Sequence, residues 1–204
     1  TTRAIEGKIS EVEDLTEMLV SSGETITLQT KDTNVAIVNG TEYDLIQEAV
    51  IACGTTESTI QILRDADPGA TIIIEEGQNI TIDLNGFTIY NYPEIQNKGI
   101  LNVIDTDEND PGAFNFVYDA TFDEEAFTTI RNEGTLYLNG IFVSVNYNQP
   151  NYEGNIYTLF NDSSERDAII YIDSESKVGG IYLEPEDPAT GKYPAFATKG
   201  NGIN

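Results

Sequence analysis

An acidic stretch near the middle of the chain carries the residue types that bind a hard cation. Residues 105–110, DTDEND, place a carboxylate, hydroxyl or amide oxygen at every position. Calcium is bound in proteins by such oxygens, commonly from alternating positions of one loop. An EF-hand loop is excluded, because its glycine belongs at the sixth position and Gly112 comes two places late. The alternatives are a solvated acidic turn or a calcium site whose ligands would be Asp105, Asp107, Asn109 and Asp110.

A second group of carboxylates has the chemistry of a glycoside hydrolase. Asp83, Asp173 and Glu175 lie at the ends or on the outward positions of predicted strands. Two carboxylates that converge on a glycosidic bond hydrolyse it by acid and base catalysis. Surface residues that alternate with inward Ile and Leu would give the same pattern. The chain has no histidine, which excludes the Ser-His and Cys-His nucleophile arrangements.

Tyrosines are the third candidate, because the chain holds 11 of them and several fall in predicted loops and on outward positions. A tyrosine on a rigid β scaffold can stack on a sugar ring and hydrogen-bond a hydroxyl. We predict a carbohydrate-binding or other ligand-binding surface, with covering of the scaffold edges as the alternative role. The predicted ligand-binding residues are Tyr137, Tyr147, Tyr152 and Tyr157.

Charge and composition narrow the classes of partner. The chain of 204 residues has 10 Lys and Arg against 35 Asp and Glu, a formal net charge of −25. So acidic a surface repels phosphate backbones and anionic headgroups, which argues against a nucleic-acid partner. There is no apolar run long enough to cross a bilayer, so we expect no membrane insertion. A single cysteine, Cys53, excludes an internal disulfide and is expected to be buried as a small apolar residue.

The residues that must position these groups have the periodicity of short strands. Between residues 79 and 89, Ile80, Ile82 and Leu84 alternate with polar residues up to an Asn85-Gly86 turn, and a further alternating run follows. The same pattern of alternating runs around an Asn-Gly turn recurs over residues 128–145. A weak repeat whose units cannot bury their apolar face alone is typical of a solenoid. The sequence therefore favours an all-β coil over a meander of antiparallel hairpins.

Two helices are predicted before the coil. Residues 10–20 begin with a Ser10 N-cap and carry apolar residues on one face, and residues 42–53 follow a capping box that starts at Thr41. Strands are expected at 25–30 and 35–38, and a loop at 91–98. We interpret residues 1–57 as an N-terminal cap over the open end of the coil, and residues 58–204 as coils that are cut off at the C-terminal end.

Two stretches resemble one known family. They are residues 40–89, which contain TIQILRD at 59–65 and NITIDLNGFTI at 79–89, and residues 130–140, IRNEGTLYLNG. They are similar to the right-handed parallel β-helix (β-solenoid) domains of the pectin-lyase-like type found in large bacterial surface proteins. The resemblance covers about half of the chain and implies that fold, with a cap containing one or two α-helices.

The resemblance also has implications for the function of the chain. Such domains are adhesin-like or of unassigned role, and their catalytic relatives are polysaccharide lyases and hydrolases. The cations of this coil are scattered in the sequence, with no evident acid-base cluster. We therefore expect a non-catalytic, secreted or cell-surface stalk that presents its loops to a glycan or a protein, as part of a longer polypeptide. No cofactor is expected, with calcium at the acidic loop as the alternative. The alternatives are a polysaccharide lyase or glycoside hydrolase and a purely structural repeat.

Overall fold

The computed structural model describes residues 17–22, 25–30, 33–90, 94–107, 109–118, 126–147, 155–163, 167–182 and 196–200. The chain forms two compact units, Thr1–Asn34 and Val35–Asn204.

The first unit contains a two-stranded antiparallel sheet. Strand β1 (Glu17–Ser22) pairs with β2 (Thr25–Thr30), with Leu19 opposite Leu28. The predicted strand at 25–30 is confirmed. The helix predicted over residues 10–20 is wrong at its C-terminal end, since residues 17–20 lie in β1, and residues 10–16 are outside the described part. Pairing with β2 supplies the hydrogen bonds that a helix would have made, and the β-branched Val20 suits a strand.

The second unit opens with a hairpin and a helix. Strands β3 (Ala36–Val38) and β4 (Thr41–Tyr43) are antiparallel, and α2 spans Ile46–Cys53. The helix predicted over 42–53 therefore begins later than expected, after Leu45, and Thr41 is not its cap. The reason is the Asn39-Gly40 loop, whose φ angles of 51° and 78° suit a two-residue hairpin turn. That turn places Thr41 opposite Val38 and commits residues 41–43 to the strand.

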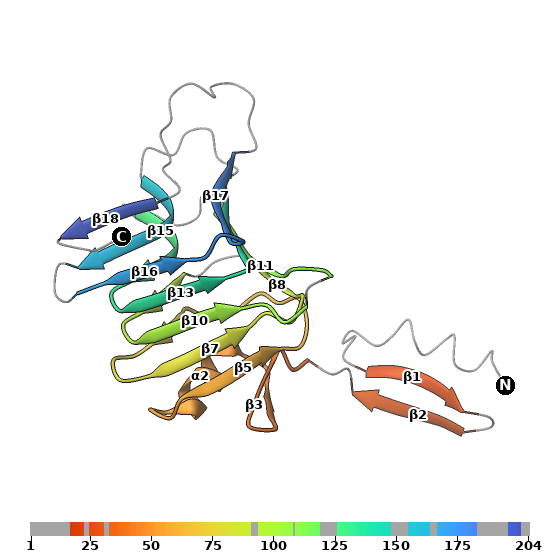
Figure 1. Ribbon diagram of the computed structural model, residues 1–204. Helices are drawn as coiled ribbons and strands as arrows, with labels where there is room; N and C mark the ends of the chain where they lie inside the picture. The colour runs from red at the N-terminus through yellow and green to blue at the C-terminus, as the bar shows by residue number, and fades with distance from the viewer. Residues whose placement is uncertain are drawn as a thin grey trace. The chain divides into compact units, whose positions relative to one another are not determined.

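Three mainly parallel sheets contain the other strands that the structure describes in the second unit (Figure 1). Sheet 1 contains β5 (Ser58–Ile62), β7 (Asn79–Asp83), β10 (Ile100–Ile104), β13 (Thr135–Asn139) and β16 (Ile169–Ile172), with β3 and β4 at its edge. Sheet 2 contains β8 (Thr88–Tyr90), β11 (Ala113–Tyr118), β14 (Phe142–Tyr147) and β17 (Lys177–Tyr182). Sheet 3 contains β6 (Ile72–Ile74), β9 (Ile95–Asn97), β12 (Ala126–Asn132), β15 (Asn155–Ser163) and β18 (Phe196–Gly200).

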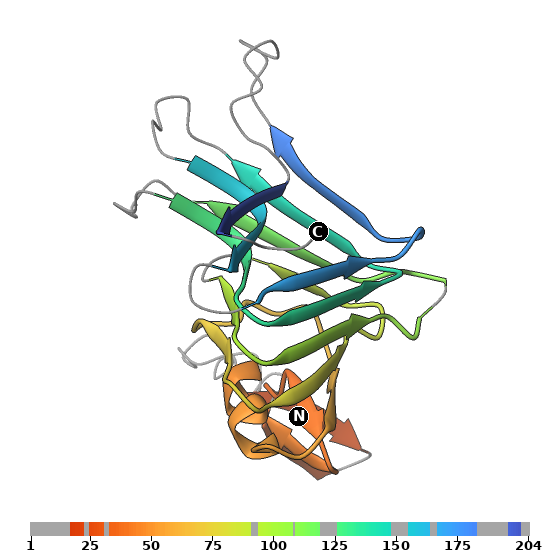
Figure 2. The same cartoon turned by 60° about the vertical axis from the view of Figure 1, so that its left-hand side comes forward.

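The chain visits these sheets in rotation. From β9 onward each strand pairs in parallel with the strand three places earlier. Figure 2 shows that strands from successive parts of the chain lie in sequence order along the sheets, from yellow through green to blue. Successive strands therefore do not form a hairpin meander within the described residues from β6 onward. An all-β fold dominated by parallel sheets is confirmed, and it is compatible with a β-helix.

Apolar side chains from successive strands form columns inside the second unit. In sheet 1, Ile60, Ile82, Val103 and Leu138 occupy equivalent positions and are fully buried. The predicted inward residues Ile80 and Leu84 are buried as well. Burial of each such side chain stabilises the fold by about 1.5–3 kcal/mol, so the columns supply most of the driving force.

The loop predicted at 91–98 is interrupted by strand β9. Ile95 is fully buried and stands between Ile72 of β6 and Ile130 of β12. Pro93 favoured a loop in the sequence, and residues 91–93 of that predicted loop lie outside the described residues. The strand predicted within residues 99–104 is confirmed as β10.

A column of asparagines lies beside the apolar columns, where sheet 3 leads into sheet 1. Asn97, Asn132 and Asn161 are fully buried and occupy equivalent positions on β9, β12 and β15. Asn97 Nδ2 donates to Asn132 Oδ1, and Asn132 Nδ2 donates to Asn161 Oδ1, both at 2.7 Å. The column satisfies polar groups at a buried corner, where an unpaired amide would cost about 1–3 kcal/mol.

Glycine permits this corner to be tight. Gly134 follows Asn132 by two residues and lies against the backbone of Gly99, which follows Asn97 in the same way. A β-carbon on Gly134 would collide with the Gly99 carbonyl oxygen. Successive turns can therefore stack at the corner because both positions lack a side chain.

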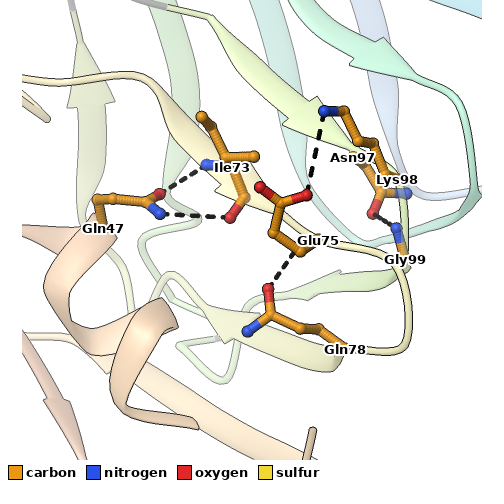
Figure 3. A network of polar contacts seen from close by, with 7 residues as sticks. All are labelled: Gln47, Ile73, Glu75, Gln78, Asn97, Lys98 and Gly99. Carbon is orange, nitrogen blue, oxygen red and sulfur yellow. Dashed lines mark hydrogen bonds and ion pairs between the residues drawn. The ribbon is translucent and has the colours of Figure 1, made fainter. Parts of the chain in front are cut away.

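Helix α2 covers the first strand of sheet 3. Gln47 accepts from the Ile73 N–H at 2.6 Å and donates to the Ile73 carbonyl at 3.4 Å (Figure 3). Gln78 Nε2 donates to the carbonyls of Val50 and Gly54 at the end of the helix, at 3.2 and 3.0 Å. The helix thereby provides hydrogen-bond partners for backbone groups at the edge of β6, which would otherwise be free to pair with another chain.

Candidate functional site

An accessible aromatic surface lies on the outer face of sheet 1. Four polar or aromatic residues occupy equivalent positions on successive strands, in the order Thr81, Asn102, Tyr137 and Tyr171. Side chains alternate along each strand, so these point away from the buried columns at the neighbouring positions. We call this row the Tyr137 ladder.

The two tyrosines of the ladder stack on each other. Their ring centroids are 4.7 Å apart and their planes differ by 7°. Tyr137 is 37 % exposed and Tyr171 is 50 % exposed. One face of each ring is covered by the other ring, which leaves the outer face of Tyr171 and the hydroxyl edges of both rings as the contact surface. The pair is thus a pre-ordered aromatic step with little rotamer freedom left to lose on binding.

Amide groups continue the ladder toward β7. Asn139 Nδ2 donates to Asn102 Oδ1 at 2.6 Å, and Asn102 Nδ2 lies 3.5 Å from Thr81 Oγ1. These exposed or half-buried amides and hydroxyls retain donors and acceptors for a ligand beside the rings. Ile100 is 41 % exposed at the start of β10 and adds apolar surface. An aromatic step flanked by amides suits a neutral, hydroxyl-bearing ligand.

The remaining predicted tyrosines are not gathered at this surface. Tyr157 lies on sheet 3, where its ring stacks on Phe160 with centroids 5.5 Å apart. Tyr147 ends β14 of sheet 2, in register with Tyr118 and Tyr182. Tyr152 is outside the described residues. The structure therefore distributes the described tyrosines over three sheets.

A charged cluster, unseen in the sequence, surrounds Arg131 on sheet 3. Its guanidinium lies 3.5 Å from Glu94 and 4.0 Å from Asp162, and it sits over the Phe160 ring at 5.1 Å. Thr128 donates its hydroxyl to Glu94. The guanidinium is thus shared between two carboxylates from different turns. Its Nε donates to Glu94 Oε1 at 3.5 Å, and this connection between turns suits a structural role.

The predicted calcium loop is tied together by its own backbone. Asp105 Oδ1 accepts from the N–H groups of Gly86 and Asp107, at 3.0 and 2.8 Å, and Oδ2 accepts from the Gly112 N–H. Asp107 Oδ1 accepts from Asn109 and Asp110. Among the described residues, no three His, Cys, Asp or Glu side chains converge to hold a metal ion. These hydrogen bonds are those expected of an acidic turn, and they leave the alternative, a calcium site at Asp105, Asp107, Asn109 and Asp110, untested.

The carboxylates weighed as hydrolase candidates, with surface residues as the alternative, also stabilise turns. Asp83 is buried and accepts from the backbone N–H of Asn85 and from both the N–H and the hydroxyl of Thr106. Asp173 accepts from the N–H groups of Gly140 and Ser176, at 3.1 and 2.8 Å. A hydrogen bond from the Ser176 side chain, together with these N–H groups, lowers the pKa of Asp173. Asp83 is the last residue of β7 and Asp173 follows β16, so the two carboxylates hold different turns of sheet 1.

Tyr171 is the ladder residue that sequence reasoning missed. The signal was present, because TLYLN at 135–139 aligns with IIYID at 169–173 and places Tyr171 in the position of Tyr137. The buried asparagines had a comparable signal in the repeated pattern Ile-x-Asn-x-Gly at 95–99 and 130–134.

Comparison of the chain with protein-family models, with curated proteins and with solved structures finds no significant match. In the part of the chain that the structure describes, no helix has the length and apolar character needed to span a membrane.

Proposed function

We propose that the second unit is a right-handed parallel β-helix of the pectin-lyase-like type that serves as a non-catalytic recognition module, with the Tyr137 ladder as its ligand-binding surface. The rotation of the chain through three parallel sheets and the in-register columns support the architecture. The single observation that carries the function is the exposed, pre-ordered stack of Tyr137 on Tyr171. On this proposal the module is a stalk of a secreted or cell-surface bacterial protein and belongs to a longer polypeptide.

The ligand class follows from the chemistry of the ladder. Aromatic faces contact the apolar face of a sugar ring, and amides pair with its hydroxyls. The net charge of −25 disfavours polyanionic glycans such as uronates. We therefore favour a neutral glycan on the surface of a cell or a host protein.

A polysaccharide-cleaving enzyme is the second candidate, and the Arg131 cluster is the observation that favours it. Glu94 and Asp162 lie on different turns of sheet 3 and converge on one guanidinium. Two carboxylates and a cation in one place are what such chemistry uses. Against it, the ion pairs already engage the three groups with one another.

The test is an array of neutral and acidic glycans probed with the parent chain and with Tyr171→Ala. We expect binding of a neutral glycan, weakened about tenfold in the variant, which corresponds to roughly 1.4 kcal/mol for one aromatic contact. Tyr90→Ala is the matched control, because Tyr90 is similarly exposed at 38 % but lies on sheet 2.

Three outcomes would overturn the proposal. The first is the absence of any bound glycan, and the second is equal loss of binding in Tyr171→Ala and Tyr90→Ala. The third is turnover of any polysaccharide that is abolished by Glu94→Gln, which would establish the enzyme instead.

A further inference from the structure

We propose that Asn39 is a site of spontaneous covalent modification, at which the side chain loses ammonia, whereas the chemically identical Asn-Gly pairs at residues 85 and 139 are protected by the fold. The sequence contains Asn39-Gly40, Asn85-Gly86 and Asn139-Gly140, together with a fourth pair, Asn201-Gly202, outside the described residues. The three described pairs differ in two respects that control this reaction, the hydrogen bonding of the glycine nitrogen and that of the asparagine side chain.

The reaction needs only water as co-reactant. The backbone nitrogen of the glycine gives up its proton to solvent and attacks Cγ of the asparagine. A nitrogen–carbon bond forms to close a five-membered imide, the bond from Cγ to the side-chain nitrogen breaks, and that nitrogen leaves as ammonia. Water then opens the imide at either carbonyl and leaves an aspartate or an isoaspartate. Glycine favours the attack because no β-carbon shields its nitrogen.

The pair at residue 85 is restrained at both reacting groups. Gly86 N–H donates to Asp105 Oδ1 at 3.0 Å, and Asn85 Nδ2 donates to the Ile62 carbonyl at 3.3 Å. The attack requires the proton on this nitrogen to leave, and the carboxylate holds that proton in place. The negative charge of the carboxylate also opposes the anionic nitrogen that attacks.

The pair at residue 139 is restrained in the same way by a different turn. Gly140 N–H donates to Asp173 Oδ2 at 3.1 Å, and Asn139 Nδ2 donates to Asn102 Oδ1 at 2.6 Å. A carboxylate from a neighbouring turn therefore covers the nucleophile at two separate corners, Asp105 at one and Asp173 at the other.

Asn39-Gly40 has neither restraint. Both residues are exposed, and among the described residues neither the Asn39 side chain nor the Gly40 N–H has a hydrogen-bond partner. The space around Gly40 is open, with nothing within 4 Å of where a β-carbon would stand. The hairpin around it pairs only three residues of each strand, and β4 has no partner in the sheet other than β3. Opening the turn to reach the attack geometry is therefore a local event of low cost.

The product changes the start of the second unit. Aspartate adds a negative charge at the loop, and isoaspartate adds a carbon to the main chain. A two-residue hairpin loop fixes the strand register, so the longer main chain disrupts the pairing of Val38 with Thr41.

The experiment is incubation of the folded chain at mildly alkaline pH, followed by peptide mass mapping and isoaspartate labelling at each pair. We expect Asn39 to react at least about tenfold faster than Asn85 and Asn139, as the loss of one restraining hydrogen bond of roughly 1.4 kcal/mol predicts. In urea the four pairs should react at similar rates. Equal rates in the folded chain, or a faster reaction at Asn85 or Asn139, would overturn the proposal.

Two variants isolate the cause. Asp173→Ala should raise the rate at Asn139 and leave the rate at Asn85 unchanged, because Asp105 still covers Gly86. Asn39→Gln should abolish the reaction at position 39 without changing the other sites, since the longer side chain closes the ring poorly. An unchanged rate at Asn139 in the first variant, with the fold intact by circular dichroism, would show that the carboxylate does not protect.

Discussion

Asn97 Nδ2 donates to Asn132 Oδ1 at 2.7 Å although the two residues are 35 positions apart in the sequence. Asn132 in turn donates to Asn161 and to the carbonyls of Gly134 and Ile169. One buried amide therefore connects three successive turns of the chain.

Replacing this amide should destabilise the second unit strongly. Asn132→Ala removes all of these bonds and leaves buried partners unpaired, so we expect a loss of about 2–4 kcal/mol in the free energy of unfolding, measured by urea denaturation. Asn102→Ala, on the outer face of sheet 1, is the matched control and should cost less than about 0.5 kcal/mol. Similar losses in the two variants would contradict a structural role for the buried column.

The side chain of Gln47 protects the edge of sheet 3, because it pairs with both backbone groups of Ile73. Gln47→Ala should lower the free energy of unfolding by about 1–2 kcal/mol and increase self-association in light scattering, as an uncovered strand edge does. Glu48→Ala changes an exposed residue of the same helix and serves as the control. Unchanged scattering in Gln47→Ala would show that the edge is protected by other means.

The turn that Asp173 stabilises through its hydrogen bonds should become less stable at acidic pH. Its pKa is lowered, chiefly by a hydrogen bond from the Ser176 side chain, so the folded state favours the carboxylate. This contribution is present above the ordinary aspartate pKa of about 3.9 and is lost as the pH falls through the lower value of the folded state.

The variant Asp173→Asn tests this contribution. It should be less stable than the parent chain at neutral pH, and the difference should shrink below about pH 4 in urea titrations at several pH values. A difference that is independent of pH would mean that the amide loses something other than the charge.

Cys53 should resist alkylation in the folded chain. Burial raises the pKa of its thiol, with a partly opposing hydrogen bond from Ser58, and the thiol donates to the Ala49 carbonyl at 3.1 Å. Since the thiolate is the reactive form, iodoacetamide at about pH 8 should modify the thiol slowly in buffer and rapidly in urea. The raised pKa also means that stability falls as the pH rises above about 8.5, the ordinary thiol value. Rapid labelling without urea would contradict the burial.

Calcium should have little effect on the loop at residues 105–110. Asp105 and Asp107 already accept backbone N–H groups, so a cation would have to compete with these bonds. We expect calorimetric titration to show no heat and the melting temperature to stay unchanged at millimolar calcium. A rise in melting temperature that Asp107→Asn abolishes would assign the metal site that the sequence pattern suggests.

The strand periodicity allowed much of the fold to be predicted. Alternating apolar residues such as Ile80 and Ile82 point to the same side of their strand, so they are buried together whichever parallel strands lie beside it. Local helix signals were less reliable. The capping pattern at Thr41 predicted the start of a helix, but the Asn39-Gly40 turn places Thr41 in a strand. Glu17–Val20 were predicted to be helical, but they pair with β2. Both errors arise because strand partners are supplied from elsewhere in the chain, which local propensity does not register.

The candidate site, like the fold, could be predicted only in part. Tyr137 could be singled out as outward from its own strand, but its stacking on Tyr171 depends on the register between β13 and β16. The convergence of Glu94 and Asp162 on Arg131 likewise requires three turns to be aligned. Contacts across turns depend on long-range register, and a single sequence with variable spacing between turns does not reveal it.

The register of sheet 1 is unbroken although the turns differ in length. Asn79 pairs with Ile100, and Ile100 with Thr135, yet the second interval is 35 residues against 21, and ten of its 14 extra residues fall between Asn115 of β11 and Ile130 of β12. Such a scaffold can evolve by insertion at its corners while its interior remains constant. The connections are thus free to diversify into new epitopes, whereas a single-residue deletion inside a strand would invert every side chain that follows it in that strand.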